Sequence, residues 1–247
     1  MGPNDADPSG VLVPYPEICF RGAPRAAAYV MIVDCIGGWV ADRASDQDWV
    51  TTTDLSVRMP VAVTPEEIRS VADPLRAGRR IISAQVAMSN GSGEAIAHGY
   101  TSFARVPRRD GDGKRIRIDE IERMHSEPLT EPLSEAAGIT VIDAAAGITT
   151  TELTAQLTNP MNALQGAMTA LIAEVAAIAA LDANTGEEHV VTGIELRYLS
   201  MGTIGPITTE ATVIGASSAG QVRVELRDRG HDDWIIAVVL ASLVALV

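Results

Sequence analysis

The pattern of apolar positions divides the chain into two similar halves. An alanine-rich apolar stretch runs over residues 26–42, and a second runs over residues 166–182. Both have the length and composition typical of a buried helix, and each carries one acidic residue in its interior, Asp34 in the first and Glu174 in the second. Because a buried carboxylate is unfavourable unless it is paired, each acid must have a partner or a chemical task.

Each apolar stretch is followed by segments in which apolar and polar residues alternate, the pattern of half-buried strands. Three pairs of these segments match at a nearly constant offset of 139 to 142 residues: Thr53–Met59 with Thr192–Leu199, the segment from Ala77 with that from Ala219, and the segment from Ile96 with that from Ile236. A repeat of this kind predicts an α+β fold of two tandem units, each a long helix wrapped by an antiparallel sheet.

The two predicted units comprise residues 1–106 and 134–247. Residues 107–133 between them are charged and rich in glycine and proline, which is typical of a linker. The apolar C-terminal run "WIIAVVLASLVALV" is rich in β-branched residues, so a buried strand is expected there. At fourteen residues this run is too short to span a bilayer comfortably, and no membrane partner is expected.

Composition and charge exclude several classes of protein. The net charge of −13 at pH 7 is the opposite of the basic footprint of nucleic-acid binders, so no nucleic acid is expected as a partner. The two cysteines and four histidines show no metal-ligand spacing, and no GxGxxG or P-loop occurs, so neither a metal nor another cofactor is expected. The N-terminus lacks the pattern of a signal peptide, which favours a cytoplasmic protein.

The stretch "LTNPMNALQGAMTALIAE", which ends at Glu174, resembles the hotdog-fold acyl-CoA thioesterases, most closely the phenylacetate-pathway and 4-hydroxybenzoyl-CoA type. The family pattern has an Asn or Gln, a Gly at the helix start seven residues later and an acid eight residues beyond, which Asn159, Gly166 and Glu174 match. The repeat is similar to single-chain double-hotdog proteins. The resemblance implies two tandem hotdog domains and a thioesterase that hydrolyses an acyl-CoA or acyl-carrier thioester to a free acid and a thiol.

The resemblance also implies where one catalytic site lies. Gly166 and Glu174 are about 12 Å apart along a helix, so one thioester cannot touch both. In the family the glycine and the acid come from partner hotdog units whose helices pack antiparallel. Asn159 and Gly166 of the second half should therefore face Asp34 and Thr52 of the first. The glycine amide would stabilise the oxyanion, and Asp34 would act as general base or as nucleophile, two alternatives that the sequence leaves open.

The reciprocal site is expected to be degraded. It would combine Glu174 with Cys19, Ala26 and Val191, where the first site has asparagine, glycine and threonine. This comparison predicts one working site centred on Asp34 and a second that is vestigial or used differently.

Three further residues are predicted to bind substrate. Gln165 stands where the family commonly has histidine, and Arg58 and Arg197 are candidates for the phosphates of coenzyme A. Each candidate also has a structural interpretation: Asn159 as a helix cap, Arg197 as the partner of a buried Glu174, or Arg58 as the partner of the other acid.

Two other functions stay open at this point. A hotdog hydratase or dehydratase acting on enoyl thioesters would need a histidine beside an acid, which only a residue distant in sequence such as His98 could supply. A protein that binds acyl-CoA without hydrolysing it would fit the departures at Gln165 and Ala26. In every case we expect a homo-oligomer, namely a dimer of double-hotdog chains.

Overall fold

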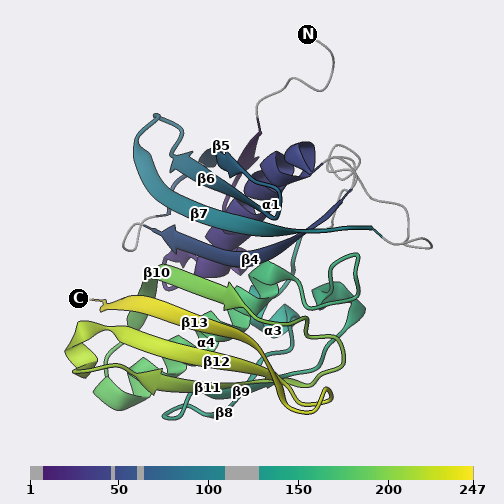
Figure 1. Ribbon diagram of the computed structural model, residues 1–247. Helices are drawn as coiled ribbons and strands as arrows, with labels where there is room; N and C mark the ends of the chain where they lie inside the picture. The colour runs from purple at the N-terminus through teal and green to yellow at the C-terminus, as the bar shows by residue number, and fades with distance from the viewer. Residues whose placement is uncertain (1–7, 46–47, 60–63, 109–127, 247) are drawn as a thin grey trace.

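An eleven-stranded antiparallel sheet runs through both halves of the chain, with two long helices behind it (Figure 1). This computed structural model describes residues 8–45, 48–59, 64–108 and 128–246. The predicted linker over 107–133 falls largely on residues outside these ranges, so it and the domain limits at 106 and 134 stay predictions.

In the first half, α1 (Ala26–Ala44) packs against β4 to β7. The elements that accompany it are β1 (Ser9–Leu12), η1 (Pro16–Ile18), β2 (Cys19–Phe20), β3 (Ala23–Pro24), β4 (Trp49–Arg58), β5 (Ile68–Ala77), β6 (Ile81–Ser89) and β7 (Ala95–Val106).

In the second half, α4 (Gly166–Thr185) packs against β9 to β13. The elements that accompany it are α3 (Leu133–Ala136), β8 (Thr140–Asp143), β9 (Ile148–Thr151), η2 (Ala155–Leu157), β10 (His189–Tyr198), β11 (Ile207–Val213), η3 (Ser217–Ala219), β12 (Gln221–Asp228) and β13 (Trp234–Ala245). The predicted fold class, with a long helix and an antiparallel sheet in each half, is confirmed. The C-terminal run is a strand, as predicted.

The two halves join through their central strands, β4 and β10, which are neighbours in the sheet order β1-β5-β6-β7-β4-β10-β13-β12-β11-β9-β8. Ser56 lies opposite Glu195 in this antiparallel pair, and the two positions are counterparts in the sequence repeat. Asp54 pairs with Arg197 on one side of them and Arg58 with Gly193 on the other. The pairing therefore relates the halves by an approximate two-fold axis through Ser56 and Glu195.

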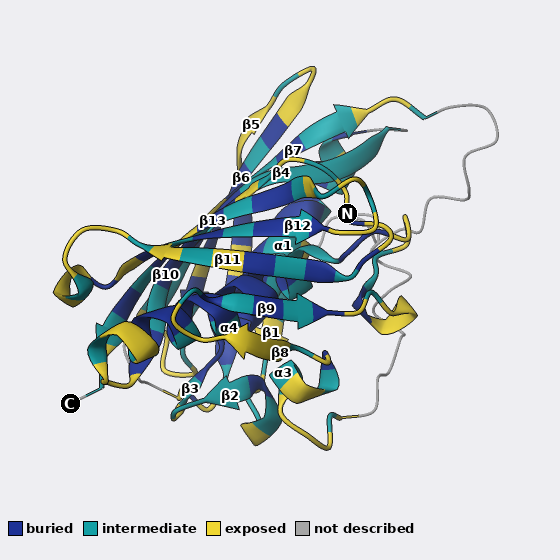
Figure 2. Cartoon of the chain, turned by 90° about the horizontal axis from the view of Figure 1, so that it is seen from below, coloured by how far each residue is buried: buried dark blue, intermediate teal, exposed yellow. Residues whose placement is uncertain are grey.

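The two helices form the centre of the core and run antiparallel. Asp34 in the middle of α1 lies beside Gly166 at the start of α4, whereas Ala27 at the start of α1 bonds to Glu174 in the middle of α4. Alanine is the strongest helix former, and its small side chain lets the helices and the sheet approach closely. Buried positions dominate α4, seen from below in Figure 2. Although α4 is apolar and long enough to cross a bilayer, 67% of its most apolar window is buried inside the protein, as in a core helix.

Candidate active site

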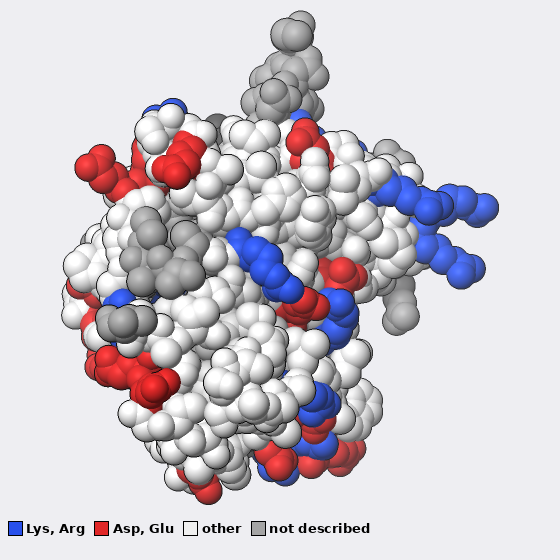
Figure 3. Space-filling model, turned by 90° about the vertical axis from the view of Figure 1, so that its left-hand side faces the viewer, with Lys and Arg blue, Asp and Glu red and all other residues white. Residues whose placement is uncertain are grey.

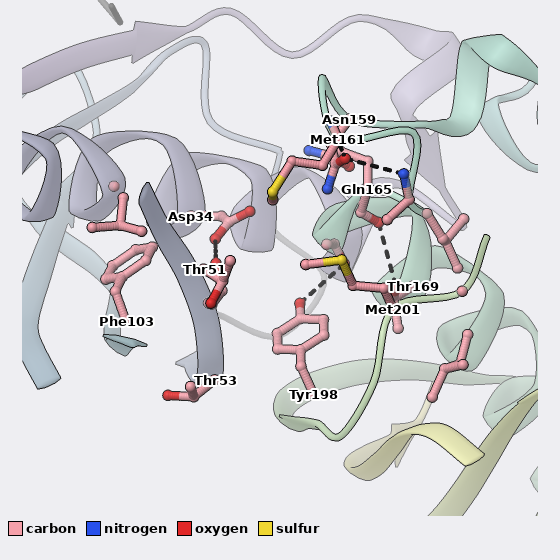
Figure 4. Close-up of a pocket in the computed structure, with 18 of the residues that line it drawn as sticks. Asp34, Thr51, Thr53, Phe103, Asn159, Met161, Gln165, Thr169, Tyr198 and Met201 are labelled. Atoms are coloured by element: carbon pink, nitrogen blue, oxygen red, sulfur yellow. Dashed lines mark hydrogen bonds between the residues drawn. The ribbon is translucent and has the colours of Figure 1, made fainter. Parts of the chain in front are cut away.

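The start of α4 meets the middle of α1 at a cavity of about 500 Å³ between the two halves (Figure 4). Asp34 lines it from α1 and Thr52 from β4, whereas Asn159, Gln165 and Gly166 line it from the loop before α4 and from its first turn. The structure thus brings together five predicted residues from the two halves.

Asp34 is bonded to its neighbour on β4. The Thr52 hydroxyl donates a hydrogen bond of 2.7 Å to Oδ1 of Asp34, while Oδ2 lies against the first turn of α4. Burial raises the pKa of the Asp34 carboxyl, and the Thr52 hydrogen bond, which favours the charged form, partly opposes this rise. A carboxylate with a raised pKa is suited to accept a proton from water near neutral pH.

Gly166 is the first residue of α4 and lies directly against Asp34. A side-chain carbon on this glycine would be 3.0 Å from Oδ2 of Asp34 and 3.1 Å from the hydroxyl of Tyr198, so a larger residue would have to displace them. The first N–H groups of a helix have no acceptor within the helix, and the helix dipole adds to their attraction for negative charge. The cavity therefore contains two features side by side: the start of α4, which favours an anion, and the carboxylate of Asp34.

Gln165 fixes the start of α4. Its Oε1 accepts a hydrogen bond of 3.1 Å from the Met168 N–H, and its Nε2 donates to Sδ of Met31 on α1 over 3.2 Å. The side chain thereby caps one N–H of the first turn and connects the two helices. These contacts give Gln165 a positioning role, and its predicted contact with substrate stays a prediction.

Asn159 lines the cavity but also organises the loop before α4. Its Oδ1 accepts hydrogen bonds from the N–H groups of Met161, at 2.9 Å, and Ala163, at 3.2 Å. The interpretation of Asn159 as the cap of the helix is therefore wrong, because α4 begins seven residues later and Gln165 is its cap. Its predicted role in orienting water or the thioester carbonyl stays a prediction.

Tyr198, at the end of β10, is a cavity residue that the sequence reasoning missed. Its hydroxyl donates a hydrogen bond of 3.1 Å to the carbonyl oxygen of Gly166. Burial and the nearby charge of Asp34 raise the pKa of this phenol well above its usual value, so it stays protonated. One difference within the sequence repeat could have identified Tyr198: it aligns with Met59, whereas the residues before it match well between the two halves.

The remaining walls are largely apolar. They consist of side chains from both halves: Trp49, Phe103, Met161, Leu164, Met201 and Ile236. Several of them are labelled in Figure 4 around the polar group of Asp34 and Tyr198. A cavity of this size and polarity, with a few convergent polar groups, is typical of a small-molecule site.

One wall is a loop that a buried carboxylate holds in place. Residues 199–202 line the cavity, and the three residues that follow them donate backbone hydrogen bonds to Asp228. The distances are 2.7 Å from Thr203, 3.0 Å from Ile204 and 2.8 Å from Gly205. Burial by itself would raise the pKa of Asp228, but these N–H donors outweigh it and lower the pKa.

Glu174 lies outside this cavity, buried beside the start of α1. Its Oε2 accepts a hydrogen bond of 3.2 Å from the Ala27 N–H, and its Oε1 is 3.8 Å from Nη1 of Arg25. Burial raises the pKa of Glu174, while the Arg25 charge and the N–H groups of Ala27 and Ala26 oppose the rise. The interpretation of Arg197 as its partner is therefore wrong. The Ala27 N–H and Arg25 are instead the groups that satisfy this acid.

The space beside Glu174 is too small for a substrate. Its volume is about 10 Å³, at the lower limit for a single water molecule. Of the three predicted counterparts of the first site, Val191 lines this space, whereas Cys19 and Ala26 do not. Arg25, which precedes α1 as Gln165 precedes α4, also lines this space.

Arg58 and Arg197 are not among the cavity residues. Both belong to the central strand pair and lie next to Glu195, with N–O distances of 2.6 Å and 3.9 Å. The interpretation of Arg58 as the partner of Asp34 is therefore wrong, and the predicted binding of substrate by the two arginines stays a prediction. On the face shown in Figure 3, the basic side chains lie in small groups and form no continuous patch among the residues described.

Other polar chemistry lies away from the cavity. His98 is on β7, where its ring packs against Tyr100 at a centroid distance of 4.9 Å, and no histidine is among the described residues that line the cavity. Within the described part of the chain, no group of three His, Cys, Asp or Glu side chains is placed to hold a metal ion.

No model of a protein family and no curated protein sequence matches the chain. Solved structures do. The acyl-ACP thioesterase of Bacteroides thetaiotaomicron VPI-5482 has a TM-score of 0.65 and 12% identity, over 95% of this chain and 96% of that one. The 12:0-ACP thioesterase of Umbellularia californica has a TM-score of 0.60 and 10% identity, over 96% and 97%.

A third similar structure, a protein with a hot dog fold from Alicyclobacillus acidocaldarius, has a TM-score of 0.58 and 12% identity, over 98% of this chain and 94% of that one. At identities this low the likeness shows the fold alone. The chain therefore has the hotdog fold, with one helix and its sheet in each half.

Proposed function

We propose that the protein is a thioesterase that hydrolyses an acyl-CoA or acyl-carrier thioester to a free acid and a thiol, at one site per chain. The observation that carries the proposal is the approach of Asp34 to Gly166, with Oδ2 of the acid 3.0 Å from the position of a side-chain carbon on the glycine. Thioesterases among the solved structures with this fold also support it.

In the proposed reaction the thioester oxygen binds at the start of α4. The Gly166 N–H and the positive end of the helix dipole stabilise the negative charge that develops on this oxygen. The absence of a side chain on Gly166 lets the carbonyl group approach the backbone, and the Gln165 cap keeps the first turn in position.

Asp34 supplies the other half of the chemistry. As general base it accepts a proton from water while the water oxygen bonds to the carbonyl carbon; the C–S bond then breaks, and the proton passes to the departing thiolate. As nucleophile it would bond to the carbonyl carbon and displace the thiolate as the C–S bond breaks, giving an anhydride that water then hydrolyses to the free acid and the regenerated carboxylate. In both cases the Thr52 hydroxyl at 2.7 Å orients the carboxylate and favours its charged form.

The apolar walls would hold the acyl group, with Phe103 contributed by the first half and Met161, Leu164 and Met201 by the second. The phenylacetate-pathway and 4-hydroxybenzoyl-CoA type, which the residues around Gly166 resemble, makes aromatic acyl groups the first to test. The proposed location is the cytoplasm.

The second site is proposed to have no catalytic role. Glu174 is neutralised by Arg25 and by the start of α1, and the space beside it holds at most one water molecule. The carboxylate would then stabilise the packing of the two helices.

The proposal is tested by measuring free thiol released from short, medium, long and aromatic acyl-CoAs. We expect turnover of at least one substrate by the wild type and a loss of at least about 100-fold in Asp34→Asn, since a general base contributes about 10²- to 10⁴-fold. Binding without any release of thiol would instead favour the acyl-CoA-binding alternative. Hydration of an enoyl thioester would favour the hydratase, although no histidine is among the described residues of the cavity.

A further inference from the structure

Two oxygen atoms flank Gly166 inside the cavity. Oδ2 of Asp34 and the hydroxyl oxygen of Tyr198 lie 3.0 Å and 3.1 Å from the same point, the position of a side-chain carbon on the glycine. One oxygen comes from α1 in the first half and the other from the end of β10 in the second. The two oxygens are therefore at most about 6 Å apart, a separation that one bridging water molecule can span.

Both oxygens can accept a hydrogen bond from a molecule bound beside Gly166. Oδ1 of Asp34 already accepts the Thr52 hydroxyl, and Oδ2 is the carboxylate oxygen that lies beside Gly166. The single proton of the Tyr198 hydroxyl is donated to the carbonyl oxygen of Gly166, which leaves the lone pairs of the phenol oxygen as acceptors. The raised pKa of this phenol keeps the proton in place.

A water molecule matches two acceptors. It has two protons to donate, one for each oxygen, and its lone pairs then point away from both, toward the carbonyl carbon of a thioester whose oxygen is bound at the Gly166 N–H.

We propose that Tyr198 is a positioning residue that, together with Asp34, holds the attacking water over Gly166. During attack the proton directed at Asp34 moves to its Oδ2 and the water oxygen bonds to the carbonyl carbon, while the second proton stays on that oxygen and keeps its hydrogen bond to Tyr198. The tyrosine itself gains and loses no proton. The inference deepens the proposed function and rests on it.

The reciprocal site beside Glu174 supports this assignment. The repeat places Met59 at the position that corresponds to Tyr198, and Met59 lines the narrow space beside Glu174. A thioether is only a weak acceptor, so this space lacks the second acceptor as well as the room for a substrate. The tyrosine thus belongs to the site that also has the glycine, the threonine and an open cavity, and methionine replaces it at the other site.

The test compares Tyr198→Phe with Tyr29→Phe. Tyr29 is a matched control, because it is also buried, lies beside Glu174 and has a hydroxyl without a hydrogen-bond partner among the described residues. We expect Tyr198→Phe to lower kcat for hydrolysis about 10- to 100-fold, the effect of losing one hydrogen bond to the attacking water, with KM changed less than about threefold. Tyr29→Phe should keep the wild-type kcat.

A second readout separates the holding of water from support of the helix. With hydroxylamine added, the acyl group partitions between the free acid and the hydroxamate, and the uncatalysed reaction is subtracted. If Tyr198 holds water, Tyr198→Phe lowers the yield of acid while largely sparing the hydroxamate, so the ratio of hydroxamate to acid rises by about 10-fold or more. A residue that only supports the Gly166 amide would lower both products together and leave this ratio unchanged.

The inference is overturned by an unchanged kcat in Tyr198→Phe, by an unchanged product ratio, or by an equal loss in Tyr29→Phe. If in these cases the wild type still releases thiol and Asp34→Asn does not, the proposed function stands and this inference alone fails. A wild type that releases no thiol from any substrate overturns both.

Discussion

The pair formed by Arg25 and Glu174 permits a quantitative prediction. The two side chains are only 4% and 3% exposed, and Nη1 and Oε1 are 3.8 Å apart. At an effective dielectric constant of about 20, two unit charges at this distance attract each other by about 4 kcal/mol. Arg25→Met keeps most of the side-chain volume but leaves the carboxylate without its cation. We expect the free energy of unfolding to fall by about 3 to 5 kcal/mol, the usual effect of breaking a buried pair.

The loss should depend on pH in a defined direction. Burial already raises the pKa of Glu174, and Arg25 is the first of the groups that oppose the rise, so its removal raises the pKa of the folded protein further. The folded variant then holds a proton that the unfolded chain releases above about pH 4.3. Its stability is therefore greatest below that pH and falls as the pH rises toward the folded pKa.

The assay is chemical denaturation at several pH values, together with thermal melting near neutral pH, where a loss of this size lowers Tm by roughly 10 °C. Arg25→Met/Glu174→Met should recover most of the stability, since it removes both charges. Arg58→Met is the matched control, because this arginine is 60% exposed and its surface pair with Glu195 contributes about 0 to 1 kcal/mol. Wild-type stability in Arg25→Met, or no recovery in the double variant, would refute the reasoning.

Three further predictions concern the cavity. Thr52→Val removes the hydrogen bond that lowers the pKa of Asp34, so the acidic limb of the kcat/KM profile should move to higher pH; an unmoved limb would contradict the role of Asp34 as base. Gly166→Ala places a carbon 3.0 Å from Oδ2 of Asp34 and 3.1 Å from the hydroxyl of Tyr198, so kcat should fall at least about 10-fold while Tm stays within a few degrees of the wild type. Normal turnover in this variant would contradict the oxyanion site at Gly166. Asp228→Asn leaves one or more loop amides without their acceptor, so the free energy of unfolding above pH 5 should fall by about 1 to 3 kcal/mol. Because the wild-type carboxylate takes up a proton as the pH drops, the difference between variant and wild type should shrink at low pH.

The sequence predicts the architecture well because the information is local and repeated. The alanine-rich runs and the alternating segments each specify their own element, and the offset near 140 residues indicates that one unit is used twice. The meeting of Asp34 with Gly166 was also expected, because the resemblance to the hotdog thioesterases implies that the glycine and the acid come from partner units whose helices pack antiparallel.

The partners of the buried groups could not be predicted in this way. Arg25, Tyr198 and Asp228 acquire their roles from the register of β4 against β10 and from loops of irregular shape, neither of which leaves a periodic signal. Arg197 was a plausible partner for Glu174 in the sequence, yet the strand pairing sets it beside Glu195 instead. Differences between the repeats, such as Tyr198 against Met59, are the signal that could have revealed more of the site.

The central claim is that each chain has one working site, between Asp34 and Gly166, and that Glu174 serves the packing of the core. The most direct test measures thiol release by Asp34→Asn and Glu174→Gln side by side on the best acyl-CoA substrate, with circular dichroism to verify that both variants are folded. The account predicts a loss of at least about 100-fold in Asp34→Asn and activity within about threefold of the wild type in Glu174→Gln. The reverse result, with turnover lost in folded Glu174→Gln and kept in Asp34→Asn, would contradict it.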